Sequence, residues 1–127
     1  MTGQQNLVRS VTAVNKSVIL VIITGQTLAL DHEKDMADSI LLSYLPSEMG
    51  GLAIAQTLLG DVSPAGKLPI TFYPESIMSE RRPEDMSLRG GSGVTYMHYK
   101  GTPIFPFGFG LSVRLSPPYF AESTQIS

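Results

Sequence analysis

The sequence predicts an α/β fold, specifically an incomplete three-layer sandwich with a mainly parallel sheet and a C-terminal β-hairpin. Three observations predict it. Ser17–Ile23, SVILVII, is continuously apolar and β-branched, as parallel strands are when both faces are covered. Segments with apolar residues at three- and four-residue steps alternate with such runs, which is the α/β pattern. Near the C-terminus, Val94–Tyr99 and Thr102–Phe105 flank Lys100-Gly101, a pair typical of a tight hairpin turn.

The first half of the chain contains a helix followed by two strands. Gln5–Val14 is predicted to be helical because Leu7, Val8, Val11 and Val14 form one apolar stripe. The strand Ser17–Ile23 follows it. The polar stretch DHEKDMAD allows a turn or a short helix, and Ser39–Tyr44, SILLSY, is a second buried strand.

The second half begins with a helix and a third strand. Gly50–Leu59 carries its apolar residues on one face, and Gly60 follows at the position where glycine commonly ends a helix. Lys67–Tyr73 is predicted to be a strand, in which Pro69 is tolerable only near the start or at an edge. Glu75–Gly93 is charged, glycine-rich and poorly periodic, so we expect a long loop.

These elements are too few to complete the fold that they predict. All three strands have the composition of strands buried on both faces, but two helices and one turn cannot cover both faces of a sheet. The chain is therefore predicted to be a piece of a larger α/β domain, with apolar faces and strand edges left open to association.

Composition excludes several classes of function. The 127 residues carry 9 basic and 11 acidic side chains, so the electrostatic footprint of a nucleic-acid-binding protein is missing. Without cysteine there can be no disulfide, zinc–thiolate site or thiol nucleophile. The longest apolar run, Val18–Ile23, is far too short to span a bilayer, and the N-terminus MTGQQNLVRS lacks the apolar core of a signal peptide. We expect a soluble chain with no membrane or nucleic-acid partner.

One candidate substrate-binding residue stands out. Glu48 lies in the loop after the second predicted strand, and ligands of open α/β sheets bind beyond the carboxyl ends of strands. The alternative is a solvated loop carboxylate. Gly50-Gly51 opens the next helix, but PSEMGG matches neither a dinucleotide-binding nor a phosphate-loop motif. A nucleotide-binding module is therefore disfavoured.

No catalytic constellation emerges from the residues themselves. His32 and His98 lack metal-ligand spacing, so no metal or cofactor is predicted. Glu33 with Asp35, and Glu84 with Asp85, are carboxylate pairs, but sequence proximity does not establish the separation that glycoside hydrolysis needs. A set of aromatic residues could stack on a sugar or pack as hairpin core: Tyr96, Tyr99, Phe105, Phe107 and Phe109.

Three ordered motifs nevertheless resemble the C-terminal α/β-sandwich domain of glycoside hydrolase family 3, the β-glucosidases and β-xylosidases. The first is a Tyr-Pro-Gly-x-x-Gly-Gly helix start, matched here by Pro46, Gly50 and Gly51. The second, Gly-Asp-x-x-Pro-x-Gly-Lys-Leu-Pro-x-Thr, is matched from Gly60 to Thr71. The third is the closing PFGFGLS, from Pro106 to Ser112. The region PEDMSLRG and the predicted hairpin look more like the β-xylosidase branch.

The resemblance implies a role and also what the chain lacks. Such enzymes remove terminal β-linked glucose or xylose with retention and without cofactor. Their nucleophilic Asp lies in an N-terminal (β/α)₈ barrel, and the acid/base Glu lies upstream of the segment resembled here. No catalytic residue is therefore expected in this chain. Residues 1–112 would be the partial domain, and residues 113–127, which depart from the family pattern after Ser112, a divergent tail or linker.

Two hypotheses follow. The first is the C-terminal segment of an exo-β-glycosidase, inactive alone, whose partners are a β-linked glycoside and the missing barrel; the family implies a secreted or extracellular protein. The alternative is a stand-alone carbohydrate-binding or scaffold module, which the aromatic residues near the C-terminus and the lack of paired catalytic carboxylates favour.

Overall fold

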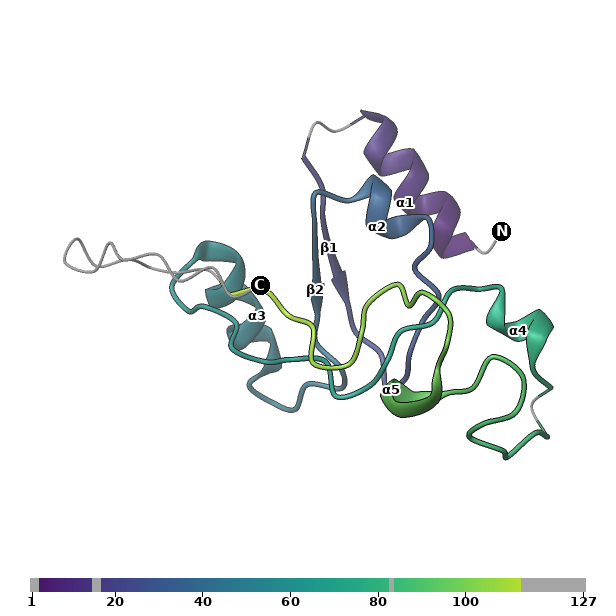
Figure 1. The fold of residues 1–127 in the computed structure, drawn as a ribbon. Helices are drawn as coiled ribbons and strands as arrows, with labels where there is room; N and C mark the ends of the chain where they lie inside the picture. The colour runs from purple at the N-terminus through teal and green to yellow at the C-terminus, as the bar shows by residue number, and fades with distance from the viewer. Residues whose placement is uncertain (1–2, 15–16, 83, 113–127) are drawn as a thin grey trace, which may run out of the picture.

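The structure is a computed structural model that describes residues 3–14, 17–82 and 84–112. Two short strands lie at its centre, and helices flank them on different sides (Figure 1). In chain order the elements are α1 (Gly3–Val14), β1 (Ile19–Ile22), α2 (Glu33–Met36), β2 (Ser39–Leu42), α3 (Gly50–Leu59), α4 (Ile77–Glu80) and α5 (Thr95–His98).

The two strands form a parallel pair, as the sequence predicts. Ile19 lies opposite Ser39, and Ile22 lies opposite Leu42. Past the ends of both strands the pairing continues, because the Thr24 amide donates a hydrogen bond of 3.1 Å to the Tyr44 carbonyl. Both predicted strands are thus confirmed, although each is shorter than predicted.

The two long helices also lie where the sequence predicts them. Helix α1 begins two residues before the predicted start and packs against α2, which forms in the polar stretch that allowed a short helix. Helix α3 lies on the other side of the strand pair in Figure 1. It ends at Gly60, whose φ of 83° is left-handed and whose amide bonds back to Gln56 and Thr57. The predicted C-terminal glycine is confirmed, because glycine enters this conformation without a Cβ penalty.

The third predicted strand, Lys67–Tyr73, does not form as a regular strand. Only Phe72 makes a ladder bridge, and its partner is the antiparallel Phe105. The Leu68 amide also donates a 2.8 Å hydrogen bond to the Phe109 carbonyl. Pro69 lies between these two contact points and has no N–H to donate, so the segment pairs at isolated points and does not form a regular strand.

The predicted C-terminal β-hairpin is also wrong. Thr95–His98 forms the helical turn α5, and Thr102–Phe105 pairs with Phe72 instead, through the Ile104 amide and the Phe72 carbonyl at 2.8 Å. The Lys100 amide bonds back to the Ser92 carbonyl at 2.9 Å, which closes a loop where the hairpin ladder was expected. The predicted loop Glu75–Gly93 is confirmed except for the single turn of α4.

The buried core is small for a chain of this length. Among the residues that the structure describes, the buried hydrophobic ones are Ile22, Leu30 and Phe72, which are 8%, 5% and 1% exposed. Helix α3, although apolar, has no buried residue. The α/β class is thus confirmed, but the described residues do not form a three-layer sandwich, which stays a prediction for a longer protein.

We call the exposed apolar surface of α3 and the loop before it the α3 patch. It consists of Leu45, Met49, Leu52, Leu58 and Leu59. Leu59 is 79% exposed and Leu52, seven residues earlier and so on the same helix face, is 52% exposed. Contiguous apolar surface of this kind is typical of a face that another structure covers.

The isolated chain is expected to self-associate through the α3 patch. Replacing Leu52 and Leu59 together by glutamine should shift the chain toward monomer in sedimentation velocity, because both substitutions remove apolar surface from one face. Met86→Gln, at an exposed loop position outside the patch, is the matched control and should leave the distribution unchanged. A parent chain that stays monomeric at high concentration and melts sharply would contradict this prediction.

Candidate functional site

Two surface hollows lie beside the loop that carries α5, and they share Tyr99. The first, the aromatic hollow, has a volume of about 250 Å³ and is lined by Thr71, Tyr96, Tyr99, Gly101, Pro103, Pro106 and Phe107. The second, the basic hollow, has a volume of about 230 Å³ and is lined by Arg89, Met97, His98, Tyr99 and Lys100.

The turn that carries both hollows has a strained backbone. Thr95 has a φ of 67°, the one positive φ of a residue other than glycine among the described residues. A β-branched residue adopts that conformation only when its surroundings impose it. Here the Tyr73 hydroxyl accepts a 2.6 Å hydrogen bond from the Thr95 amide, and the Tyr73 ring packs edge-on against Tyr99 with centroids 4.9 Å apart.

Two stacked rings form the exposed wall of the aromatic hollow. Tyr96 and Phe107 lie nearly parallel, at 28°, with centroids 4.6 Å apart. Both are well exposed, at 63% and 47%. Phe105 and Phe109 also stack on one another, with centroids 5.2 Å apart. Among the predicted aromatic residues, Phe105 packs against the core, whereas Tyr96, Phe107 and Phe109 are exposed.

Two hydroxyl groups lie at the inner wall of the aromatic hollow. Thr71 is 6% exposed, and its Oγ1 has no hydrogen-bond partner among the described residues. Burial raises the pKa of the Tyr99 hydroxyl, and the nearby charges of Glu80, Tyr73 and Asp31 raise it further. Tyr99 therefore keeps its proton at neutral pH and can act as a hydrogen-bond donor.

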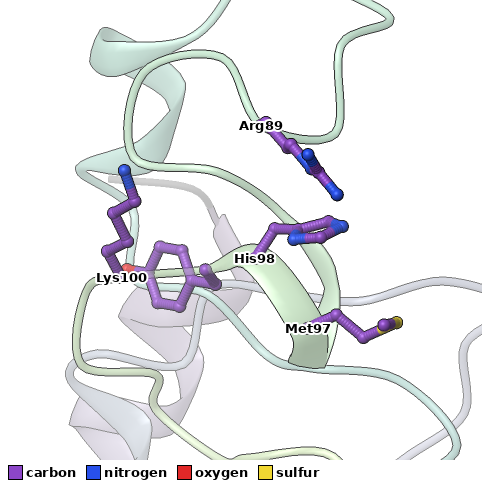
Figure 2. Close-up of a pocket in the computed structure, with 5 residues that line it drawn as sticks. Arg89, Met97, His98 and Lys100 are labelled. Carbon is purple, nitrogen blue, oxygen red and sulfur yellow. The ribbon is translucent and has the colours of Figure 1, made fainter.

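The basic hollow is lined by Arg89, His98 and Lys100 and has no acidic side chain in its wall. Figure 2 shows the Arg89 guanidinium directed toward the His98 ring, while Lys100 extends the other way. No ion pair of these three side chains is present within the described residues, so the hollow is an exposed basic surface.

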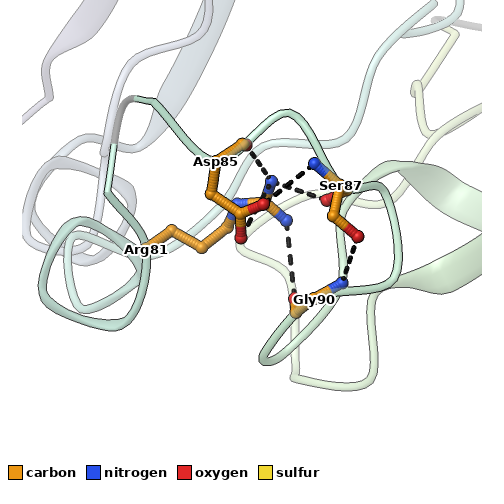
Figure 3. A network of polar contacts seen from close by, with 4 residues as sticks. All are labelled: Arg81, Asp85, Ser87 and Gly90. Atoms are coloured by element: carbon orange, nitrogen blue, oxygen red, sulfur yellow. Dashed lines mark hydrogen bonds and ion pairs between the residues drawn. The ribbon is translucent and has the colours of Figure 1, made fainter.

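A polar network centred on Arg81 holds the loop beside the basic hollow (Figure 3). The Arg81 guanidinium donates hydrogen bonds to the Asp85 carbonyl at 2.5 Å and the Ser87 carbonyl at 2.7 Å. It also lies 3.6 Å from the Asp85 carboxylate. That carboxylate in turn accepts the Ser87 amide at 2.9 Å. The loop has no helix or strand to satisfy its backbone groups, and the Arg81 and Asp85 side chains bond several of them instead. The role of the network is therefore structural.

The structure leaves Glu48 apart from both hollows. It is exposed in the loop between β2 and α3, and its side chain makes no hydrogen bond or ion pair among the residues described. Next to it, Gly50 lies so close to Pro46 that a side chain there would overlap the proline ring, whereas Gly51 faces open space. The first of the two glycines therefore serves close packing of the helix start against Pro46.

The other sequence candidates are not brought together. His32 is exposed at the start of α2, whereas His98 lies in the basic hollow. Within the described ranges no group of three or more His, Asp or Glu side chains is arranged to hold a metal ion, and no helix has the length and apolar character to cross a bilayer. Glu33 is buried and Asp35 exposed, so this pair does not face a shared cleft.

Three residues of this region were not singled out by sequence reasoning. Thr71 was assigned to a strand, Thr95 to a hairpin and Arg81 to a loop. A buried threonine hydroxyl and a left-handed threonine leave no pattern in the sequence. The only available signal was the cluster of tyrosine and phenylalanine residues on both sides of Lys100-Gly101, which does mark the wall of the aromatic hollow.

Comparison with known proteins identifies relatives along nearly the entire chain. The glycosyl hydrolase family 3 C-terminal domain matches residues 1–113. The β-xylosidase/α-L-arabinofuranosidase 1 of Medicago sativa subsp. varia is 41% identical in an alignment 117 positions long, which covers 86% of this chain and 15% of that protein. The periplasmic β-glucosidase of Salmonella typhimurium is 36% identical in a gapped alignment 142 positions long, which covers 98% of this chain and 18% of that protein.

Solved structures show the same relationship. A family 3 exo-β-xylosidase in complex with a xylobiose aziridine probe superposes with a TM-score of 0.80 at 31% identity. The β-D-glucoside glucohydrolase of Trichoderma reesei superposes with a TM-score of 0.72 at 30% identity. These alignments cover 86% and 87% of this chain but 15% and 17% of the two enzymes. The chain therefore spans about one sixth of the length of the proteins that it matches.

Proposed function

This chain belongs to the family of glycosyl hydrolase family 3 C-terminal domains, and on that premise we propose that it is the C-terminal segment of a retaining exo-β-glycosidase. The substrate we propose is a glycoside with a terminal β-D-xylosyl or β-D-glucosyl residue. The observation that carries the proposal is the agreement of fold and sequence with an exo-β-xylosidase, at a TM-score of 0.80 and 31% identity. Hydrolysis by such an enzyme proceeds through a glycosyl-enzyme intermediate.

In the proposed enzyme this segment completes a larger sheet and helps to wall the sugar pocket against the barrel. The exposed α3 patch supports this role, because a helix without a buried residue needs a further layer to cover it. The chain covers only 15% of each of these two relatives, and we propose that the remaining part corresponds to the barrel and the rest of the sandwich, which would be its partners. We propose residues 1–112 as the partial domain; the tail or linker, residues 113–127, lies outside the described residues.

The isolated chain is expected to be inactive. By family resemblance, both reactive carboxyl groups lie in parts of the enzyme that precede this segment. No release of nitrophenol is therefore expected from nitrophenyl β-D-xyloside or β-D-glucoside with the purified chain. Robust hydrolysis by a pure sample that Glu48→Gln reduces would overturn the proposal, because it would place a reactive acid within this segment.

A chimeric enzyme tests the function directly. We would replace the matching C-terminal segment of a family 3 exo-β-xylosidase by this chain and measure kcat and KM on nitrophenyl β-D-xyloside. The chimera is expected to keep activity within about tenfold of the parent, a difference of roughly 1.4 kcal/mol in the activation barrier. Deleting the segment is the control and should abolish folding and activity together. A folded but inactive chimera would contradict the proposal.

Glu48 is tested in the same chimera. If its carboxylate binds substrate, Glu48→Gln should raise KM more than it lowers kcat, because uniform binding would be lost. Glu84→Gln, at another exposed loop carboxylate, is the matched control and should leave both parameters unchanged. Equal kinetics for the two variants would assign Glu48 to the solvated loop.

The alternative function is a stand-alone carbohydrate-binding or scaffold module. The observation that favours it is the exposed ring pair of Tyr96 and Phe107 in the aromatic hollow. The chimera distinguishes the two functions. A glycosidase segment should restore activity to the truncated xylosidase, whereas a stand-alone module should not. We propose a secreted or periplasmic location, which the name of the periplasmic β-glucosidase relative supports.

A further inference from the structure

The aromatic hollow has the construction of a small sugar-binding site. Its outer wall is a pair of stacked, exposed rings, and its inner wall carries hydroxyl groups. Small-molecule sites combine an apolar lining with a few placed polar groups in this way. Pockets for drug-sized ligands begin at roughly 300 Å³, so the 250 Å³ of this hollow suits a single ring.

The unpartnered hydroxyl of Thr71 points independently to a ligand. A buried polar group without a partner costs stability, and most such groups in folded proteins are satisfied. Thr71 Oγ1 is unpartnered among the described residues, although Thr71 is 94% buried in a wall of the hollow. The oxygen itself is enclosed, so a hydroxylated ligand supplies the missing hydrogen bond only when the side chains that cover it move aside.

Charge defines the class of that ligand. The lining side chains are aromatic rings, prolines, a glycine and a threonine, so the wall carries no carboxylate or cation. Tyr99 is protonated at neutral pH, as tyrosine ordinarily is, and burial with the neighbouring acids raises its pKa further. A neutral ligand is favoured, with C–H groups on a ring face for Tyr96 or Phe107 and hydroxyl groups at its rim for Thr71 and Tyr99.

We propose that the aromatic hollow is a pyranose-binding site that stacks one neutral β-linked sugar unit on the Tyr96–Phe107 wall. A β-xylosyl or β-glucosyl ring fits this chemistry, because its substituents are equatorial and both of its faces present C–H groups. The choice of this sugar rests on the proposed function, whereas the presence of a binding site does not. The exposed basic hollow next to it, which carries no unpartnered buried group, has no part in the proposal.

Binding is tested on the 127-residue chain by saturation-transfer NMR with xylotriose, a method suited to weak ligands whatever the association state of the protein. Saturable transfer to the sugar protons at millimolar concentrations is expected. Tyr96→Ala and Phe107→Ala should each weaken binding about tenfold, since one ring carries the sugar and the other supports that ring by stacking on it. Both rings are well exposed, so the far-UV circular dichroism of these variants should match that of the parent.

Thr71→Val separates a ligand contact from a structural role. The hydroxyl makes no bond in this structure, so its removal should leave the unfolding midpoint unchanged or raise it. Binding of xylotriose should nevertheless weaken by about fivefold, as expected for one lost hydrogen bond. A lower midpoint with unchanged sugar binding would assign the hydroxyl to the fold and overturn its role in the site.

Two further variants fix the position of the site. Met97→Ala is the matched control, because Met97 follows Tyr96, is 66% exposed and lines the other hollow; its binding should equal that of the parent. Gly101→Ala would place a methyl group 2.5 Å from the Tyr99 hydroxyl and so should reduce binding by narrowing the hollow. No saturable transfer, or equal losses in Tyr96→Ala and Met97→Ala, would overturn the proposal.

These results are independent of catalysis. A chimera that hydrolyses xyloside while the chain binds no xylotriose would refute the sugar site and leave the proposed function intact. Saturable binding by the chain, together with a folded but inactive chimera, would refute the proposed function and support the site.

Discussion

Replacing Phe72 by alanine is expected to unfold the chain. Phe72 is 1% exposed, the most deeply buried large side chain among the described residues, and its ring meets Phe105 edge-on with centroids 6.3 Å apart. Its backbone also bridges to Phe105, so the same residue joins the two C-terminal segments. Truncating a buried phenylalanine costs about 3–5 kcal/mol, whereas whole domains are stable by only about 5–15 kcal/mol.

The measurement is the rate of trypsin cleavage together with far-UV circular dichroism, because proteolysis reports opening even when a protein associates. Phe72→Ala should be digested much faster than the parent and lose much of its helical signal. Leu59→Ala is the control; its side chain is 79% exposed, so the change should lie within about 0.5 kcal/mol. Similar digestion of the two variants would show that Phe72 does not hold the core.

Replacing Gly93 by alanine should open the α5 loop. Gly93 is buried with a φ of 71°, and an added Cβ would overlap the His98 carbonyl oxygen and lie 2.7 Å from its carbon. The left-handed conformation alone costs an alanine about 1–2 kcal/mol, and the overlap with backbone cannot be relieved by rotating a side chain. The loop must therefore shift as a whole.

Trypsin supplies a local readout, because Arg89 and Lys100 lie on either side of Gly93. Cleavage after these two residues should accelerate by about tenfold or more, which corresponds to roughly 1.4 kcal/mol of easier local opening. Gly108→Ala is the matched control: it has a φ of 78° but open space around the added Cβ, so only the conformational cost applies. If Gly93→Ala and Gly108→Ala lose the same stability, the overlap with the His98 carbonyl does not contribute to the free energy of local opening.

Local sequence rules succeeded where one segment decides its own structure. The helix α3 was predicted with its bounds, because its apolar spacing and the terminal Gly60 are local signals. The parallel strands were predicted from β-branched runs whose composition suits burial on both faces. The family resemblance was carried by motifs that are likewise contiguous, and it proved correct across residues 1–113.

The same rules failed where the partner of a segment decides its structure. Lys67–Tyr73 and Thr102–Phe105 both have strand-like composition, but Lys67–Tyr73 was predicted as a strand without a partner and Thr102–Phe105 with the wrong one. Their true pairing, through Phe72 and Phe105, joins segments more than thirty residues apart, and composition does not encode that choice. Val94–Tyr99 has no hairpin partner; it contains the helical turn α5, and the Val94 amide bonds to the Leu88 carbonyl of the preceding loop.

By itself, then, the sequence determined the α/β class, the two parallel strands, the ends of α3 and the family. Each of these depends on the types and spacing of residues that are neighbours in the chain. Only the tertiary structure decided the antiparallel contact at Phe72, the left-handed Thr95 and the hollow between Thr71 and the stacked rings. The physical reason is that these features depend on contacts between distant segments. The Tyr73 hydroxyl that bonds to the Thr95 amide, for example, lies twenty-two residues away in the chain.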